Sequence, residues 1–263
     1  MKNIMSICVV VALVLSAGHV RAAEVDDIVA KANEAMYYQA GDGRADVKMT
    51  VTDSLGRTRE RGMTILRKDT GVDGKQKYYV YFHQPDDVRG MTYLVWKNVG
   101  TDDDRWLYLP ALDLVRRVAA SDKRSSFVGT NFAYEDISGR GTEEDGHTLL
   151  GEENGMYKIK SVPKDPGSVE FSYFITWVDM NDFIPRKAEY YDKNGTLYKT
   201  IEALEVKDVG GFPTVVKMKA TDFNAGSNTV SEFSDVKYDL GTDENIFSER
   251  FLRRPPRQYI DKQ

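Results

Sequence analysis

The chain has 263 residues, with 41 Asp and Glu against 36 Lys and Arg, so its formal net charge at pH 7 is −5. An acidic balance argues against general nucleic-acid binding, which needs a basic face. With 41% hydrophobic residues the chain can bury a large core, and its length suits one sizeable all-β domain.

The N-terminus has the pattern of a secretory signal peptide. Lys2 precedes the apolar run Ile4–Leu15, and Val20-Arg21-Ala22 resembles a cleavage site. The run is shorter than the roughly 20 residues that a membrane-spanning helix needs. We therefore expect residues 1–22 to be a signal peptide and residues 23–263 to be one domain. The only cysteine, Cys8, lies in the expected signal peptide, which excludes disulfides and cysteine-bound metal from the mature chain.

The first predicted element of the mature chain is an amphipathic helix over Glu24–Gln39. Its apolar residues recur at helical spacing, at Val25, Ile28, Val29, Ala32 and Met36. From Ala45 the period changes to two, which predicts β-strands. Alternating segments continue to Asp113–Val118, break, and resume from Met156 to Tyr238. The count of about eleven strands predicts a mainly β fold built from one meandering antiparallel sheet.

Two stretches depart from the alternation. Ser121–Gly146 is rich in serine, glycine and charge, and predicts an ordered loop region with one helical turn near Tyr134-Glu135-Asp136. Asn194-Gly195 is the clearest hairpin signal in the chain. The tail is predicted to form a short helix over Phe247–Phe251 and then an extended end.

No motif of an enzyme, a metal site or a cofactor site stands out. His83 and His147 lie outside any metal-binding pattern, and the nucleophile elbow G-x-S-x-G is absent. Asp102-Asp103-Asp104 lacks the spaced acids and glycine of a calcium loop. We therefore predict a protein that is not an enzyme and that has no catalytic residue, cofactor or metal.

The most informative stretch runs from Asp104 to Ile137. It places large apolar side chains, including Trp106 and Phe127, beside a basic cluster, in an otherwise acidic chain. Such a stretch is either ordinary core with a solvated basic loop, or a site for an amphiphile with an anionic head. Methionines on the strands would suit a pocket for variable acyl chains, since their side chains are adaptable.

Two blocks, D-R-W-L-Y-L-P-A-L-D-L-V-R-R (Asp104–Arg117) and S-F-V-G-T-N-F-A-Y-E-D (Ser126–Asp136), resemble the LolA-like outer-membrane lipoprotein-sorting proteins. The spacing of Phe82, Pro85, Gly90 and Leu94 supports the likeness. The chain is most similar to the larger branch of that family, often found beside RND/MMPL-type exporters. The resemblance implies an unclosed β-barrel whose N-terminal helix and loops form a lid over a hydrophobic cavity. It also implies a soluble periplasmic protein that carries acyl chains without covalent chemistry.

The leading hypothesis is a periplasmic carrier or chaperone that binds acyl chains of lipoproteins or other lipids and moves them toward the outer membrane. The alternative is an adaptor or sensor module of an inner-membrane exporter, and a lipid hydrolase that depends on an acid such as Glu135 is a third. The expected partners are the cargo, an inner-membrane exporter and an outer-membrane acceptor, and not nucleic acid. The candidate cavity residues are Met49, Met63, Ile65, Tyr79, Tyr81, Met91, Tyr93, Trp106 and Tyr108. The candidates for contact with a head group or a partner are Arg116, Arg117, Lys123 and Arg124.

Overall fold

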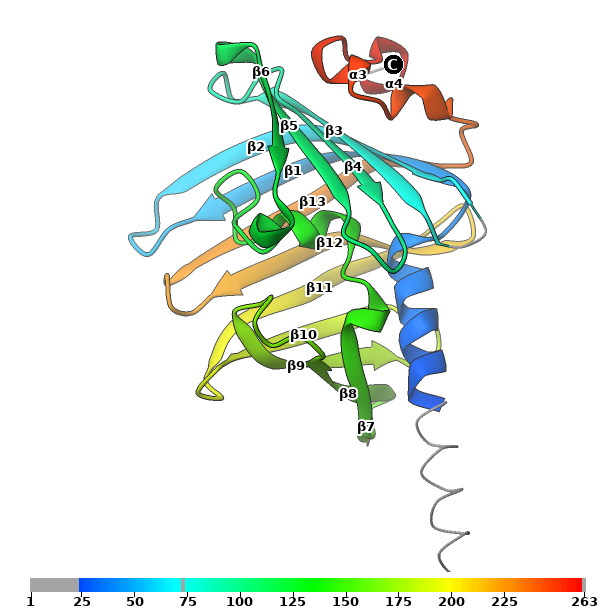
Figure 1. Ribbon diagram of the computed structural model, residues 1–263. Coiled ribbons are helices and arrows are strands. Elements are labelled where there is room, and N and C mark those ends of the chain that lie inside the picture. Colours follow the sequence, from blue (N-terminus) through cyan, green and yellow to red (C-terminus); the bar gives the residue numbers. More distant parts are fainter. Residues whose placement is uncertain (1–23, 72–73, 262–263) are drawn as a thin grey trace, which may run out of the picture.

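The computed structural model describes residues 24–71 and 74–261, and its main feature is a single curved antiparallel sheet (Figure 1). The sheet has thirteen strands in the order β6-β5-β4-β3-β2-β1-β13-β12-β11-β10-β9-β8-β7. It does not close, because β6 and β7 pair with one neighbour each. The predicted mainly β fold with an N-terminal helix is thus confirmed. The expected signal peptide, residues 1–22, lies outside the described residues.

The described part of the N-terminal helix covers residues 24–37. The strands are β1 Asp42–Thr52, β2 Thr58–Asp69, β3 Gln76–Gln84, β4 Thr92–Lys97, β5 Asp104–Leu109, β6 Leu114–Val118, β7 Asp145–Glu153, β8 Met156–Pro163, β9 Phe171–Asp179, β10 Pro185–Asp192, β11 Leu197–Val209, β12 Phe212–Asp222 and β13 Ser227–Tyr238. The short helices are η1 Pro110–Leu112, η2 Ala120–Asp122, α2 Tyr134–Ser138, η3 Thr142–Glu144, η4 Glu244–Ile246, α3 Arg250–Arg253 and α4 Arg257–Ile260.

The sheet has more strands than the roughly eleven that alternation predicted. One strand that the pattern did not predict is β7, which is an edge strand with Gly151 at an irregularity in its pairing with β8. An edge strand is stabilised from one side only and tolerates polar residues, so its sequence carries a weak signal. The predicted turn at Asn194-Gly195 does join β10 to β11, and Gly195 adopts a φ of 78° there.

The two edges of the sheet are consecutive in the chain, so the segment between them must cross the molecule. This crossing segment (residues 119–144) runs from β6 over the concave face to β7 and includes the predicted helical turn, α2. Phe127, Phe132 and Tyr134 pack into the apolar core of strands β1–β5. Farther along the sheet, the Asn131 amide donates to Thr229 Oγ1 at 3.0 Å on β13. The crossing segment therefore contacts both halves of the open sheet.

The N-terminal helix covers the other half of the concave face (Figure 1). Its buried residues Val25, Ile28 and Ala32 pack against Ile159 of β8 and Val178 of β9. These helical residues are the ones whose spacing predicted the amphipathic helix. The helix and the crossing segment together form the lid of the concave face.

The C-terminal segment packs on the opposite, outer face of β3–β5. Its buried residues Ile246, Phe247, Leu252 and Ile260 form a cluster with Tyr79, Tyr81, Leu94 and Trp106. The Tyr79 hydroxyl donates to the Phe251 carbonyl at 2.7 Å, and Trp96 Nε1 donates to the Phe247 carbonyl at 2.8 Å. The predicted short helix overlaps α3, and residues 254–256 after it are not helical. The predicted extended end is wrong beyond them, where α4 forms and its Ile260 joins this cluster. In the part of the chain that the structure describes, no helix has the length and apolarity to cross a membrane.

Candidate functional site

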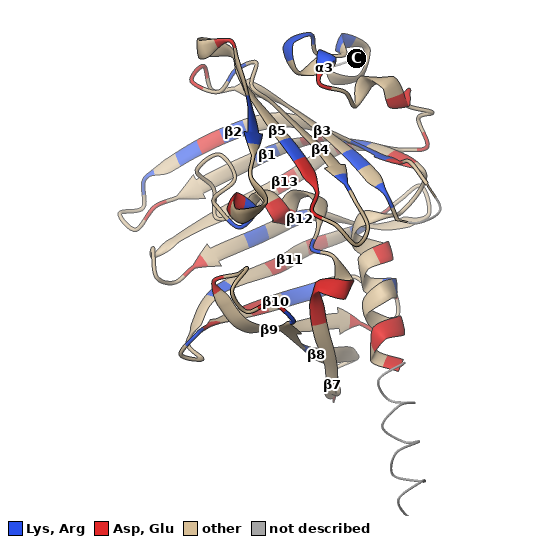
Figure 2. Ribbon diagram, viewed as in Figure 1, with Lys and Arg blue, Asp and Glu red and all other residues tan. Residues whose placement is uncertain are grey.

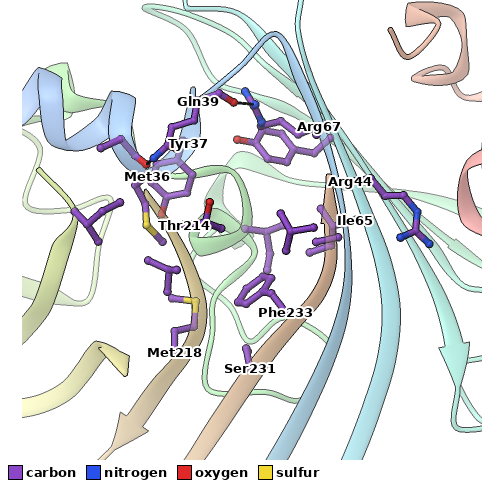
Figure 3. Close-up of a pocket in the computed structure, with 18 of the residues that line it drawn as sticks. Met36, Tyr37, Gln39, Arg44, Ile65, Arg67, Thr214, Met218, Ser231 and Phe233 are labelled. Atoms are coloured by element: carbon purple, nitrogen blue, oxygen red, sulfur yellow. Dashed lines mark hydrogen bonds between the residues drawn. The ribbon is translucent and has the colours of Figure 1, made fainter. Parts of the chain in front are cut away.

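An apolar cavity lies on the concave face, between the sheet and the lid (Figure 3). It consists of two pockets, each with a volume of about 190 Å³. Five residues line both pockets, so the pockets adjoin: Met36, Tyr37, Phe132, Asp136 and Met218. The first pocket lies over β1, β2, β12 and β13, and the second lies between the helix and β8–β12.

The walls of the first pocket come from alternate residues of neighbouring strands. Met49 of β1, Ser231 of β13 and Met218 of β12 are directly paired across the sheet, and Ile65 of β2 and Phe233 of β13 extend the same surface. Alternation places every second residue of a strand on the concave face, which explains why these residues share one wall. Figure 3 shows Met36 and Met218 on one side of the pocket and Ile65 and Phe233 on the other. Flexible thioethers allow this wall to adapt to ligands of different shape.

One polar atom in the wall has no partner. Ser231 is fully buried, and its Oγ makes no hydrogen bond with any described residue. A buried hydroxyl without a partner costs about 1–3 kcal/mol.

We expect the substitution Ser231→Ala to raise the free energy of unfolding by about 1 kcal/mol, because it removes an unpaired polar group at little cost in volume. Chemical denaturation of the ligand-free protein measures this change. Ser161→Ala is the comparison, since Ser161 is also buried but its Oγ lies 2.8 Å from His147 Nδ1. The Ser161 substitution should destabilise the protein. A loss of stability in both variants would show that the Ser231 hydroxyl does have a hydrogen-bond partner.

An ionised carboxylate lies where the two pockets meet. Asp136 Oδ2 accepts from Lys199 Nζ of β11 at 2.8 Å and from the Ala133 amide at 2.7 Å. Its Oδ1 accepts from Arg124 Nη1 at 3.1 Å. Burial alone would raise the pKa of Asp136, but Lys199, Arg124 and the Ala133 amide outweigh burial and lower the pKa to about 2. This carboxylate therefore connects α2 of the crossing segment to the second half of the sheet.

This low pKa gives a prediction for acid pH. The carboxyl of an unfolded Asp has a pKa near 3.9, so the stability that Asp136 contributes is present above about pH 5 and is lost as the pH falls toward 2. A pKa that is lowered by about 2 in the folded state corresponds to a stabilisation of about 2–3 kcal/mol. The difference in unfolding free energy between wild type and Asp136→Asn should therefore shrink across this pH range. If this difference in unfolding free energy stays constant from neutral pH down to about pH 2, the pKa of Asp136 is not lowered in the folded protein.

Asp136, Lys199 and Arg124 belong to a larger ionic cluster, which also includes Lys123, Glu135, Glu144 and Glu170. Lys123 Nζ lies 2.7 Å from Glu144 Oε2 and 3.1 Å from Glu135 Oε1. Arg124 Nη2 lies 2.9 Å from Glu170 Oε1, and the Arg124 guanidinium stacks 5.3 Å from the Phe171 ring. Burial raises the pKa of Glu170, but the bonds from Arg124 outweigh it and the pKa is lowered.

The four candidates for head-group or partner contact therefore lie in two different places. Lys123 is buried, and the Arg124 side chain is 8% exposed, with both cations paired inside the protein. Arg116 and Arg117 are exposed on the edge strand β6. The four residues lie within nine positions of one another in the sequence. The crossing segment turns into the core after β6, so Lys123 and Arg124 are buried while Arg116 and Arg117 stay at the edge.

The nine residues predicted to line the cavity lie on two different faces of the sheet. Met49 and Ile65 line the first pocket, and Met63, Met91 and Tyr93 belong to the apolar core on the same face. As a correction, the structure places Tyr79, Tyr81, Trp106 and Tyr108 on the outer face, where they pack with the C-terminal segment. The reason is the phase of the alternation, because Tyr78, Val80 and Phe82 of β3 take the concave positions.

Some cavity residues were not among the candidates. Met36 and Tyr37 come from the helix, and Met218, Ser231 and Phe233 come from the last two strands. The alternation of Val216, Met218 and Ala220 was visible in the sequence, but it does not show that β13 pairs with β1 and that β12 follows β13 in the sheet. The strand order supplies that information.

A polar cleft of about 770 Å³ adjoins the second pocket, and both are lined by Asn33, Gly141 and Thr142. Carboxylates of Glu34, Asp69 and Asp103 line the cleft, and burial raises the pKa of each. The apolar cavity therefore continues into a polar, water-accessible region. Between residues 24 and 261, leaving residues 72–73 aside, no group of three His, Asp or Glu is placed to hold a metal ion.

Three solved structures are similar to this one over most of the chain. A DUF1329 family protein from Desulfovibrio piger is similar with a TM-score of 0.82 and 29% identity, over 88% of this chain and 99% of that chain. An outer-membrane lipoprotein-sorting protein domain from Vibrio parahaemolyticus has a TM-score of 0.81 and 28% identity, over 89% and 100%. A LolA superfamily protein from Nitrosomonas europaea has the same fold, with a TM-score of 0.68 and 21% identity over 86% and 98%.

A search of curated proteins finds no match to the chain. A family model described as "Uncharacterized protein" matches residues 74–254, which is more than half of the chain. The protein therefore belongs to the DUF1329-like family, and it shares its fold with the LolA superfamily protein from Nitrosomonas europaea.

Proposed function

We propose that the protein is a periplasmic carrier that binds acyl chains of lipoproteins or other lipids in the concave cavity and moves them toward the outer membrane. The observation that carries this proposal is the pair of adjoining apolar pockets beneath a lid, with methionines in their walls. The expected signal peptide supports a periplasmic location, and the lipoprotein-sorting domain from Vibrio parahaemolyticus supports the cargo class.

The energetics favour an acyl chain as the ligand. Each methylene that leaves water contributes about 0.8 kcal/mol, so a partly buried chain supplies useful affinity without a covalent bond. The polar end of the same molecule would lie in the adjoining polar cleft, where it stays hydrated. A role as an exporter adaptor would use an outer surface and leaves the cavity without a purpose.

A fluorescent fatty-acid probe tests the proposal. Saturable binding to the mature protein, with displacement by unlabelled lipid or by a lipidated peptide, is the expected result. Absence of saturable uptake by protein that has been stripped of ligand and refolded would contradict it.

A further inference from the structure

The edge of the sheet at β6 carries exposed arginines and leucines that the cavity does not use. The arginine rim, as we define it, consists of Leu112, Leu114, Arg116, Arg117, Arg253 and Arg254, all exposed. Figure 1 places β6 and α3 at the end of the molecule away from β7, and Figure 2 shows basic residues on both elements.

The two parts of the rim are far apart in sequence and are held together by side-chain contacts. Arg253 Nε donates to Asp113 Oδ1 at 2.9 Å, and its Nη2 donates to the Asp113 carbonyl at 3.2 Å. The Tyr108 hydroxyl donates to the same carboxylate oxygen at 3.2 Å. Asp113 lies between Leu112 and Leu114 and adopts a left-handed φ of 44°. These bonds hold a non-glycine residue in that conformation and fix the η1 tip beside α3.

The arginines of the rim differ from those in the interior. Arg105 and Arg140 are largely buried, and each pairs with a carboxylate, Asp103 and Asp145. Arg116 and Arg254, by contrast, are exposed and form no ion pair with any residue in 24–71 or 74–261. The other two rim arginines are paired, Arg117 with Asp104 and Arg253 with Asp113. In a chain with a net charge of −5, the two exposed arginines without an ion pair provide a local site for anions.

The two exposed leucines of the rim indicate which kind of anionic partner the arginines would bind. Leu112 at the η1 tip is 70% exposed and Leu114 is 45% exposed, directly beside the arginines. At a lipid surface, phosphate groups lie within a few ångströms of acyl chains, so a protein that binds there presents cations and apolar side chains together. Guanidinium groups match phosphate oxygens in geometry. An acidic protein segment would match the arginines but would leave Leu112 exposed.

We propose that the arginine rim docks on an anionic membrane surface, where Arg116 and Arg254 bind lipid phosphates and Leu112 inserts between the acyl chains. This docking site is separate from the cavity and does not depend on the ligand that the cavity binds. It would bring the open edge of the sheet to the membrane.

Flotation with vesicles of phosphatidylcholine, with and without phosphatidylglycerol, tests the docking site. Wild type should float with the anionic vesicles, less so as salt is raised, and should not float with phosphatidylcholine alone. Each basic residue at an anionic surface contributes about a fivefold change in partitioning, so Arg116→Glu/Arg254→Glu should lower binding by about 25-fold or more. Leu112→Asp should also weaken binding.

Two matched variants control for charge and for loss of an exposed leucine. Arg59→Glu/Lys207→Glu makes the same change in net charge at exposed positions outside the rim, and Leu55→Asp changes a leucine that is 75% exposed at the β1–β2 turn. Both controls should bind as wild type does, and all variants should keep the wild-type circular dichroism spectrum. Failure of wild type to float at low salt, or equal losses in the rim variants and their controls, would overturn the proposal. Rim-dependent capture by an acidic peptide without vesicle binding would overturn it in favour of a protein partner.

Discussion

Asp136→Asn should lower the free energy of unfolding by about 3–5 kcal/mol, because removing one partner of a buried ion pair leaves the other charge uncompensated. The Lys199 side chain is 8% exposed and pairs with Asp136 alone among the described carboxylates. Arg124 retains Glu170 and Glu135, so most of the cost arises at Lys199. Asparagine keeps the shape of the side chain and can still accept from the Ala133 amide, which isolates the effect of the charge.

Chemical denaturation at neutral pH measures this loss, and a double-mutant cycle identifies its source. Lys199→Met removes the orphaned cation, so the double variant Asp136→Asn/Lys199→Met should be more stable than Asp136→Asn alone. Asp122→Asn is the control, since Asp122 lies in the same crossing segment but is exposed. A loss below about 1 kcal/mol for Asp136→Asn, equal to that of the control, would show that the ion pair does not hold α2 to the sheet.

Met218→Trp should weaken acyl-chain binding by about 100-fold. Met218 lines both pockets, so a larger ring at this position takes space from each of them. Excluding about four methylenes would cost about 3 kcal/mol of binding free energy. The new side chain is apolar and lies in a cavity, so the fold should tolerate it.

Probe displacement measures the affinity of this variant, and Leu204→Trp is its control. Leu204 lies on β11, is 49% exposed and lines neither pocket. The control should keep wild-type affinity, and both variants should keep the wild-type unfolding transition. Unchanged affinity in a folded Met218→Trp protein would place the binding site elsewhere.

The positions of the strands could largely be predicted from the sequence, because apolar and polar residues alternate along most of them. The face that each residue occupies could not. Tyr79 and Tyr81 are as large and apolar as the cavity residues, and only the docking of the C-terminal segment on them shows that they lie on the outer face. The sequence signal for β3 is ambiguous because both faces of this strand are buried.

The ionic cluster was also beyond prediction, for a related reason. Lys123 and Arg124 look like a solvated basic loop when only their neighbours are considered. Their partners Glu144 and Glu170 lie 21 and 46 residues away, and Lys199 lies 63 residues from Asp136. Such pairs follow from the path of the crossing segment between the two sheet edges, which local patterns do not determine.

Under the proposed function, loading and release of the cargo would depend on the lid. The crossing segment contributes Phe132 and Asp136 to both pockets and is attached to β11 through Lys199. Movement of this segment would change the cavity walls on both sides at once. An acceptor that displaces the crossing segment would therefore lower the affinity of both pockets for the acyl chain of the cargo.

The most direct test of the central claim is native mass spectrometry of the mature protein, purified from a bacterial periplasm without detergent, alongside Met218→Trp. The account predicts a discrete added mass on wild type that lipid extraction identifies as a lipid or an acylated peptide, and its loss in the variant. A wild-type protein that is free of bound lipid and takes up no fatty-acid probe, or the same added mass on both proteins, would contradict it.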